Sequence, residues 1–148
     1  MQDQPTTPRR VLFVCAGNTC RSPIAAAMAR ELLGVAVHVE SAGISAADGA
    51  SATQDAVRAM KERGLDISNH RSRSFSALNL HDFDLLVALT PAIAQDVRHH
   101  GADAPRVATL NIPDPYGKGL DAYRATALAI ERDLRSLFGP NLERPLPK

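Results

Sequence analysis

The chain has 148 residues, of which 45% are hydrophobic and 22% charged, and its formal net charge is +1 at pH 7. This length suits a single domain with a substantial core, and a charge near zero gives no electrostatic reason to expect nucleic acid or an anionic membrane as partner. The apolar runs are much shorter than a membrane-spanning helix, and no signal-peptide core follows the polar N-terminus, so we expect a cytoplasmic protein.

The first part of the chain reads as a tail, a strand and a helix. Residues 1–9 are polar and are expected to form a flexible tail, whereas the short apolar segment RVLFVC (10–15) predicts a strand buried on both faces. The pair Ser22-Pro23 predicts a helix start, with Ser22 as N-cap and the proline at the first helical position. Apolar residues then recur at helical spacing until Gly34, which marks the end of that helix.

The rest of the chain continues this alternation. A second pair, Thr90-Pro91, predicts another helix start, and the regular apolar spacing from Leu120 to Leu137 predicts the clearest helix of the chain. The other expected elements are strands at 35–43, 83–90 and 106–112, a weaker helix that ends at Gly64, and a proline-rich tail at 140–148.

Strands that are apolar along their length and alternate with helices indicate a parallel sheet covered on both faces. We therefore predict an α/β fold with a single domain at residues 10–139, built on a four-stranded parallel sheet in the order 2-1-3-4 with helices on both faces. In open sheets of this kind, ligands bind beyond the carboxyl ends of the strands. The segments after the first and fourth strands, CAGNTCRS (15–22) and IPDPYG (112–117), are thus expected to meet at one crevice.

The segment from Cys15 to Arg21 has the composition of an anion-binding loop. It joins a strand to a helix N-terminus, where free N–H groups and the helix dipole favour an anion. Gly17 permits close backbone approach and Asn18 tolerates a left-handed conformation, so the loop can form an anion nest together with its other residues, Ala16, Thr19 and Cys20. Arg21 offers a planar fork for two phosphate oxygens, and the same positive field stabilises a thiolate. Cys15 is therefore the predicted nucleophile for attack on phosphorus, with a phosphocysteine intermediate.

A thiolate cannot protonate a leaving group, so this chemistry needs a general acid on the opposite side of the crevice. Asp114 is our candidate, because the two prolines of the PDP turn stiffen the backbone that carries its carboxyl group. Tyr116 is expected to wall the entrance and to meet the substrate side chain.

Other phosphate-binding and metal-binding patterns are missing from the sequence. CAGNTCRS lacks the second glycine and following lysine of nucleotide-binding P-loops, and the chain has no G-x-G-x-x-G for a dinucleotide. Cys15 and Cys20 have no second ligand pair at the spacing of a structural zinc site, and two thiols do not make a disulfide framework.

The segment VCAGNTCRSPIAA together with DPYG resembles the low-molecular-weight protein tyrosine phosphatases, whose relatives include protein arginine phosphatases and one class of arsenate reductase. The resemblance extends from Val11 to about Phe138 and implies the same four-stranded parallel sheet flanked by helices. It also implies a phosphorylated protein or peptide as substrate, a site that binds phosphate or sulfate, and no metal or organic cofactor. We expect a monomer.

The resemblance implies a role for each matching residue. Cys15 corresponds to the nucleophile, Arg21 to the phosphate-binding arginine, and Asp114 to the general acid that later activates water. The supporting positions are a hydroxyl that stabilises the departing thiolate (Ser22), a strained loop asparagine (Asn18) and two residues that brace that asparagine (Ser41 and His70).

Several alternatives stay open at this point. Arsenate reductases of this family use further cysteines, and this chain has none beyond Cys20, whose role is either packing or redox pairing with the nucleophile. A non-catalytic phosphate-binding module would use the same loop but has no need of Asp114. Thr19 stands where the tyrosine phosphatases tend to carry an aliphatic residue and the arginine phosphatases a threonine, so the substrate carries phosphotyrosine, phosphoarginine or both. The basic cluster HRSRS (70–74) contacts acidic substrates or is a solvated loop, and the small net charge favours the solvated loop.

Overall fold

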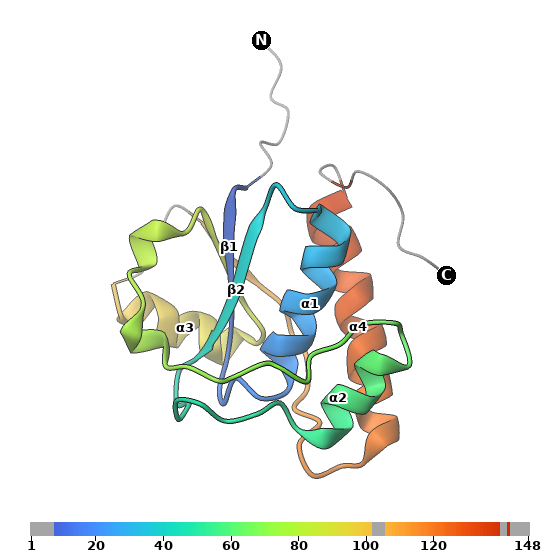
Figure 1. The fold of residues 1–148 in the computed structure, drawn as a ribbon. Helices are drawn as coiled ribbons and strands as arrows, with labels where there is room; N and C mark the ends of the chain where they lie inside the picture. The colour runs from blue at the N-terminus through green and yellow to red at the C-terminus, as the bar shows by residue number, and fades with distance from the viewer. Residues whose placement is uncertain (1–7, 102–105, 140–141, 143–148) are drawn as a thin grey trace.

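The computed structural model describes residues 8–101, 106–139 and 142. Within these ranges the chain forms a four-stranded sheet with helices on both faces (Figure 1). Two short 3₁₀ helices, Phe75–Ala77 and Leu80–Asp82, precede the third strand. The other elements are, in chain order, β1 (Arg10–Cys15), α1 (Arg21–Leu33), β2 (His38–Gly43), α2 (Gln54–Lys61), β3 (Leu85–Ala88), α3 (Pro91–His99), β4 (Val107–Thr109) and α4 (Leu120–Phe138).

The strand order is β2-β1-β3-β4 and each neighbouring pair is parallel, which confirms the predicted fold class and strand order. The chain passes from β1 to β2 on one side and then to β3 on the other, so the strand order reverses at β1. The carboxyl end of β1, where Cys15 lies opposite Gly43 of β2, is therefore the switch point at which folds of this class bind ligands.

The central strand β1 is buried on both faces, as its uniform apolar sequence predicts. Because successive side chains of a strand point to opposite faces, Val11, Phe13 and Cys15 join the core under α1, α2 and α4. Leu12 and Val14 join a second core under α3. Figure 1 shows the same division, with α3 on one side of the sheet and the other three helices on the opposite side. Packing on both faces fixes the position of Cys15.

Three strands are shorter than the sequence pattern predicts, and the third covers only Leu85–Ala88 of the expected 83–90. The second begins at His38 and not at Val35, because Gly34 ends α1 with a φ of 80° and the fully exposed Val35 lies in the turn that follows. The fourth covers Val107–Thr109, and its residues are half-buried or, at Thr109, exposed because it is an edge strand. Beyond it, Ile112 still donates to the carbonyl of Leu89 at 2.9 Å, so the chain stays beside the end of β3.

The two Ser/Thr-Pro pairs have different roles. Thr90 caps α3 as predicted, because its Oγ1 accepts from Ile93 N at 3.1 Å and Pro91 is the first helical residue. The predicted cap at Ser22 is wrong, because α1 begins at Arg21 and has no side-chain cap. The hydroxyl of Ser22 is instead engaged with the loop before the helix.

The predicted tails at 1–9 and 140–148 lie outside the described residues, except for residues 8, 9 and 142. In the part of the chain that the structure describes, none of the helices combines the length and the hydropathy needed to cross a bilayer.

We predict that Thr90→Ala lowers the free energy of unfolding by about 1 kcal/mol, because the first turn of α3 loses its side-chain acceptor. Urea denaturation measures the change. Thr90→Ser keeps the hydroxyl and is the matched control, which is expected to recover most of the loss. Equal stability of Thr90→Ala and the wild type would show that the cap contributes nothing.

Candidate active site

Cys15 is the last residue of β1, and only 2% of it is exposed. Its Sγ lies 2.9 Å from Ser22 Oγ and accepts a hydrogen bond from the main-chain N–H of Asn18 at 3.3 Å. Both contacts come from the segment that enters α1, so the sulfur lies at the base of a loop in front of a helix N-terminus.

Backbone hydrogen bonds hold the outside of this loop. The carbonyls of Cys15 and Ala16 each accept at 2.9 Å, from Ile44 N and Ser45 N, in the segment after β2. The carbonyl of Thr19 accepts from Thr53 N at 3.0 Å, just before α2. The loop is therefore held by contacts with residues far from it in the sequence.

Gly43 is a supporting residue that the sequence analysis missed. A Cβ at this position would lie 2.6 Å from Ala16 O and 3.0 Å from Asn18 N, so no side chain fits between β2 and the loop. The signal in the sequence was a glycine at the end of a strand, where it commonly marks close approach of two backbones. Only the pairing of Gly43 with Cys15 shows which backbone approaches.

Asn18 is fully buried and has a φ of 57°, the one positive φ of a non-glycine residue in the described ranges. Its Nδ2 donates to Ser22 Oγ at 2.8 Å and to Ser41 Oγ at 3.0 Å. Its Oδ1 accepts from the main-chain N of Arg73 at 3.0 Å. The side-chain amide thus forms hydrogen bonds with three other residues. These bonds offset the cost of a left-handed backbone in a residue other than glycine.

His70 contacts the main chain of the same asparagine. Its Nε2 lies 2.7 Å from Asn18 O, and since a carbonyl only accepts, Nε2 carries the hydrogen and donates it. Burial lowers the pKa of His70, and the nearby positive charges of Arg30, Arg71 and Arg73 lower it further, against the opposing effect of this hydrogen bond. The neutral imidazole is sufficient for the contact. The structure therefore brings both Ser41 and His70 against Asn18.

Arg21 connects the loop to the segment after β4. The arginine is 7% exposed, and its Nη1 donates to Ile112 O at 2.9 Å. Its Nη2 lies 3.9 Å from Asp114 Oδ2, so the two segments predicted to share a crevice do meet. The other oxygen of Asp114 accepts from Tyr116 N at 3.0 Å, which orients the carboxyl group from its own turn.

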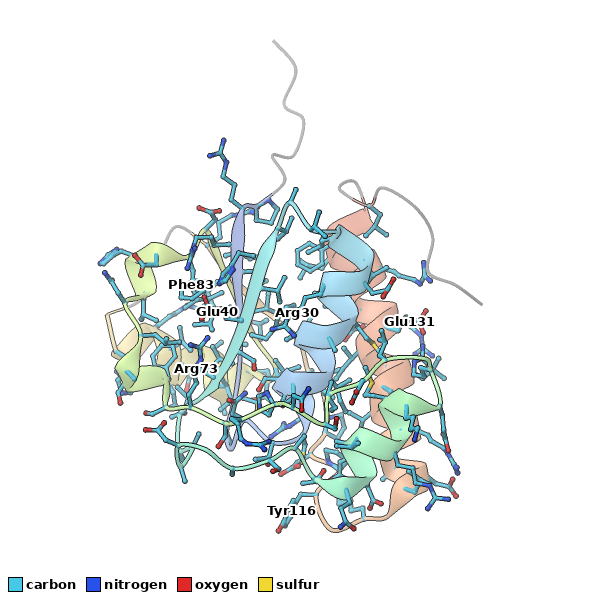
Figure 2. All side chains as sticks on the ribbon, viewed as in Figure 1. Arg30, Glu40, Arg73, Phe83, Tyr116 and Glu131 are labelled. Atoms are coloured by element: carbon cyan, nitrogen blue, oxygen red, sulfur yellow. The ribbon has the colours of Figure 1, made fainter. Side chains whose placement is uncertain are left out.

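Tyr116 is 68% exposed and follows Asp114 on the same loop. Figure 2 shows its side chain pointing away from the rest of the molecule, on the loop that precedes α4. Asp114 is also exposed, with 57% of its side chain accessible, whereas the sulfur of Cys15 is buried. The arrangement therefore has a buried sulfur at the base and two solvent-accessible side chains at the rim.

Cys20 lies on the core side of the loop. Its Sγ lies 3.2 Å from Tyr123 Oη of α4 and 3.7 Å from Thr53 Oγ1. Burial, together with the Cys20 thiol, raises the pKa of Tyr123 to about 12, so the phenol keeps its proton. These contacts are those of a residue packed between the loop and α4. Thr19, beside it, is half-buried.

The described residues include no group of three or more His, Cys, Asp or Glu side chains that is able to hold a metal ion. What the residues around Cys15 offer instead is a sulfur, a guanidinium and a carboxyl group from three different segments. Such a set is suited to covalent capture of a tetrahedral anion.

A protein-family model and several known proteins each match most of this chain. A family model described as low molecular weight phosphotyrosine protein phosphatase matches residues 10–147. A probable low molecular weight protein-tyrosine-phosphatase, EpsP, from Ralstonia nicotianae is 37% identical over 131 residues, which cover 84% of this chain and 90% of that protein. A protein-arginine-phosphatase from Bacillus subtilis is 34% identical over 140 residues, which cover 86% of this chain and 93% of that protein.

The fold is shared with solved structures. The crystal structure of the tyrosine phosphatase Wzb from Escherichia coli K30, in complex with sulphate, matches with a TM-score of 0.80 at 27% identity. The match covers 88% of this chain and 96% of that chain. With a family match over almost its whole length and relatives similar over most of it, the chain belongs to the low molecular weight phosphotyrosine protein phosphatase family.

Proposed function

We propose that this chain is a cysteine-dependent protein phosphatase, which hydrolyses phosphorylated side chains through a phosphocysteine at Cys15. The observation that supports this most directly is the position of Cys15 Sγ, which lies within hydrogen-bonding distance of Ser22 Oγ and Asn18 N at the start of α1. The short distance between Arg21 and Asp114 adds an anion-binding group and an acid to the same site. Membership of the phosphatase family supports the same reaction.

In the first step, the Cys15 sulfur attacks phosphorus, and the bond from phosphorus to the substrate side chain breaks as the S–P bond forms. Asp114 donates its proton to the leaving oxygen or nitrogen, so that atom does not depart as an anion. Arg21 binds two non-bridging oxygens through its planar fork. The five-coordinate transition state spreads negative charge over these oxygens, and the loop N–H groups and the α1 dipole stabilise it.

In the second step, the Asp114 carboxylate takes a proton from a water molecule. The water oxygen forms a bond to phosphorus, the S–P bond breaks, and inorganic phosphate is released. Ser22 donates a hydrogen bond to the departing sulfur, which leaves as a thiolate. Asp114 is protonated again at the end, ready for the next substrate.

Two alternatives are less well supported. A phosphate-binding module without catalysis has no use for a carboxyl group near the anion, yet Asp114 Oδ2 lies 3.9 Å from Arg21 Nη2. Arsenate reduction needs thiols to resolve the intermediate, and the chain has only Cys15 and Cys20. Arsenate-dependent consumption of a reduced thiol would revive that alternative.

The substrate side chain is phosphotyrosine, phosphoarginine or both, and we propose that Thr19 contributes to the choice. Its hydroxyl can hydrogen-bond a guanidinium or orient a water, whereas an aliphatic group at this position would pack against a ring. Its partial exposure at the loop and the similarity to a protein-arginine-phosphatase support this assignment.

We predict that Cys15→Ser abolishes hydrolysis of para-nitrophenyl phosphate, because a hydroxyl is a much weaker nucleophile than a thiolate.

Asp114→Asn keeps the shape of the acid but not its proton and is expected to lower kcat by roughly 10²- to 10⁴-fold. The loss is expected to be larger for phenyl phosphate, whose poorer leaving group depends more on the acid. Steady-state kinetics on both esters measure it.

Asp121→Asn is the matched control for the acid, because Asp121 lies on the first turn of α4 and pairs with the half-exposed Arg124. It is expected to keep the kcat of the wild type. Undiminished turnover by Cys15→Ser would be fatal to the proposed function. Binding of a phosphopeptide by the wild type without release of phosphate would favour the non-catalytic module.

We predict that Thr19→Ile shifts the ratio of kcat/KM for phosphotyrosine and phosphoarginine peptides about tenfold towards phosphotyrosine, since a methyl or hydroxyl contact is worth this much in a specificity pocket. Phosphate release from matched peptides measures the ratio. Retained activity of Thr19→Ile on para-nitrophenyl phosphate is the control for an intact loop. If the ratio stays unchanged, Thr19 is not the selector.

A further inference from the structure

Arg73 connects the edge strand β2 to the loop that holds Cys15. Its main-chain N–H donates to Asn18 Oδ1 and its main-chain carbonyl accepts from Gly43 N, both at 3.0 Å. Its side chain donates from Nε to Ser41 O at 3.1 Å, and its guanidinium forms an ion pair with Glu40. The expectation of a solvated loop at 70–74 is therefore wrong at this residue, which is fixed at four points.

These contacts form a closed ring with Ser41. Asn18 Nδ2 donates to Ser41 Oγ, Arg73 N donates to the other end of the same amide, and Arg73 Nε holds the Ser41 carbonyl. Because a main-chain N–H can only donate, it must face the amide oxygen and not the amide nitrogen. The main chain of residue 73 thus sets the direction in which the Asn18 amide points, and the contacts of the Arg73 side chain with Ser41 and Glu40 hold that main chain in place.

The direction of that amide reaches the sulfur through Ser22. Asn18 Nδ2 donates to Ser22 Oγ at 2.8 Å, so the Ser22 oxygen accepts there and its own hydrogen remains for Cys15 Sγ, 2.9 Å away. If the amide were reversed, its oxygen would compete with the sulfur for the same hydrogen. The hydrogen bond from Ser22 to the sulfur therefore depends on the orientation of Asn18.

Glu40 holds the side chain of Arg73 in place. Only 17% of the Glu40 side chain is exposed, and its carboxylate also pairs with His38 and lies 3.3 Å from Arg10 Nη2. Burial alone would raise the pKa of Glu40, but hydrogen bonds from Arg73 and His38 hold it below its usual value. Glu40 is thus an anion at neutral pH, and it anchors Arg73 by charge.

We propose that Arg73, held by Glu40, is a positioning residue that orients the Asn18 amide and, through Ser22, directs a hydrogen bond to Cys15. The role rests on the proposed function for its effect on turnover. The reactivity of the Cys15 thiol reports the same effect without any phosphate ester, so the two proposals can fail separately.

Arg30 provides a matched control. It lies beside β2 like Arg73, and its Nη2 donates to Val39 O at 2.8 Å, two residues before Ser41 (Figure 2). Both arginines satisfy carbonyls of an edge strand, which protects that edge from other chains. Of these two arginines, only Arg73 also forms a hydrogen bond with Asn18, through its main-chain N–H.

The test compares Arg73→Met, Glu40→Gln and Arg30→Met by two measurements. The first is kcat and KM for para-nitrophenyl phosphate, and the second is the rate at which iodoacetamide alkylates Cys15 at a fixed pH, followed by peptide mass. We expect Arg73→Met to lower both kcat and the alkylation rate about tenfold, because small displacements of a catalytic group are costly. Glu40→Gln is expected to lower both in the same direction, with KM changing less than kcat. Arg30→Met is expected to leave both near the wild type.

Ser22→Ala supplies a double-mutant cycle, because it breaks the path between Asn18 and Cys15. In that background Arg73→Met is expected to cost little more, so the two losses are not additive. Additive losses, or an equal loss in Arg30→Met, would overturn the positioning role. If circular dichroism shows that Arg73→Met does not fold, Glu40→Gln takes its place in the cycle. A wild type that hydrolyses no phosphate ester, but whose alkylation slows in Arg73→Met, would defeat the proposed function and leave the positioning role standing.

Discussion

The shape of the loop around Cys15 depends on one buried side-chain amide, that of Asn18. A left-handed backbone at a residue other than glycine is unfavourable, and an amide buried without partners would cost still more. Both penalties are offset because Ser22, Ser41 and Arg73 satisfy the amide, while His70 satisfies the main-chain carbonyl. The loop therefore takes its shape from tertiary contacts, and the N–H that donates to the sulfur belongs to the same residue.

The topology of the sheet places the other groups around this loop. Because β1 is central and its neighbours are parallel, the carboxyl ends of β2, β3 and β4 lie at the same edge as Cys15. β2 contributes Ser41 and Gly43 from one side, and the segment after β4 contributes Asp114 from the other. Arg21 lies between them as the first residue of α1, with its guanidinium on Ile112 O. A thiol and a carboxyl group far apart in the sequence thus lie at one edge of the sheet, as the proposed reaction requires.

The sequence was sufficient for the fold and for the local signals of the site, since apolar strands, helix ends and the Cys-to-Arg spacing are properties of short segments. It failed where two local rules compete or where a partner is distant. Ser22 satisfies the rule for an N-cap, yet tertiary contacts direct its hydroxyl to Asn18 and Cys15. Val35 fits a strand, but Gly34 turns the chain first. Gly43 carries only a general signal, a glycine at a strand end, and Arg73 carries none, because the role of each depends on a backbone contact with the loop. Ser41 and His70 were found only through the family resemblance.

The irregular segments that follow β2 and α2 supply many of the contacts that hold the loop. The segment after β2 gives N–H groups to the carbonyls of Cys15, Ala16 and Thr19, and the segment from 70 to 73 gives two donors to Asn18. The two segments also bond to each other, through Gly49 N to Ser72 O and Ser72 N to Ala50 O. A loop of five residues between a strand and a helix cannot supply these partners itself, because in the proposed function its own N–H groups bind the phosphate oxygens. The irregular segments therefore supply the hydrogen bonds that a helix or a sheet would otherwise give to the loop. The ion pair of Glu40 and Arg73 attaches one of these segments to the edge strand β2.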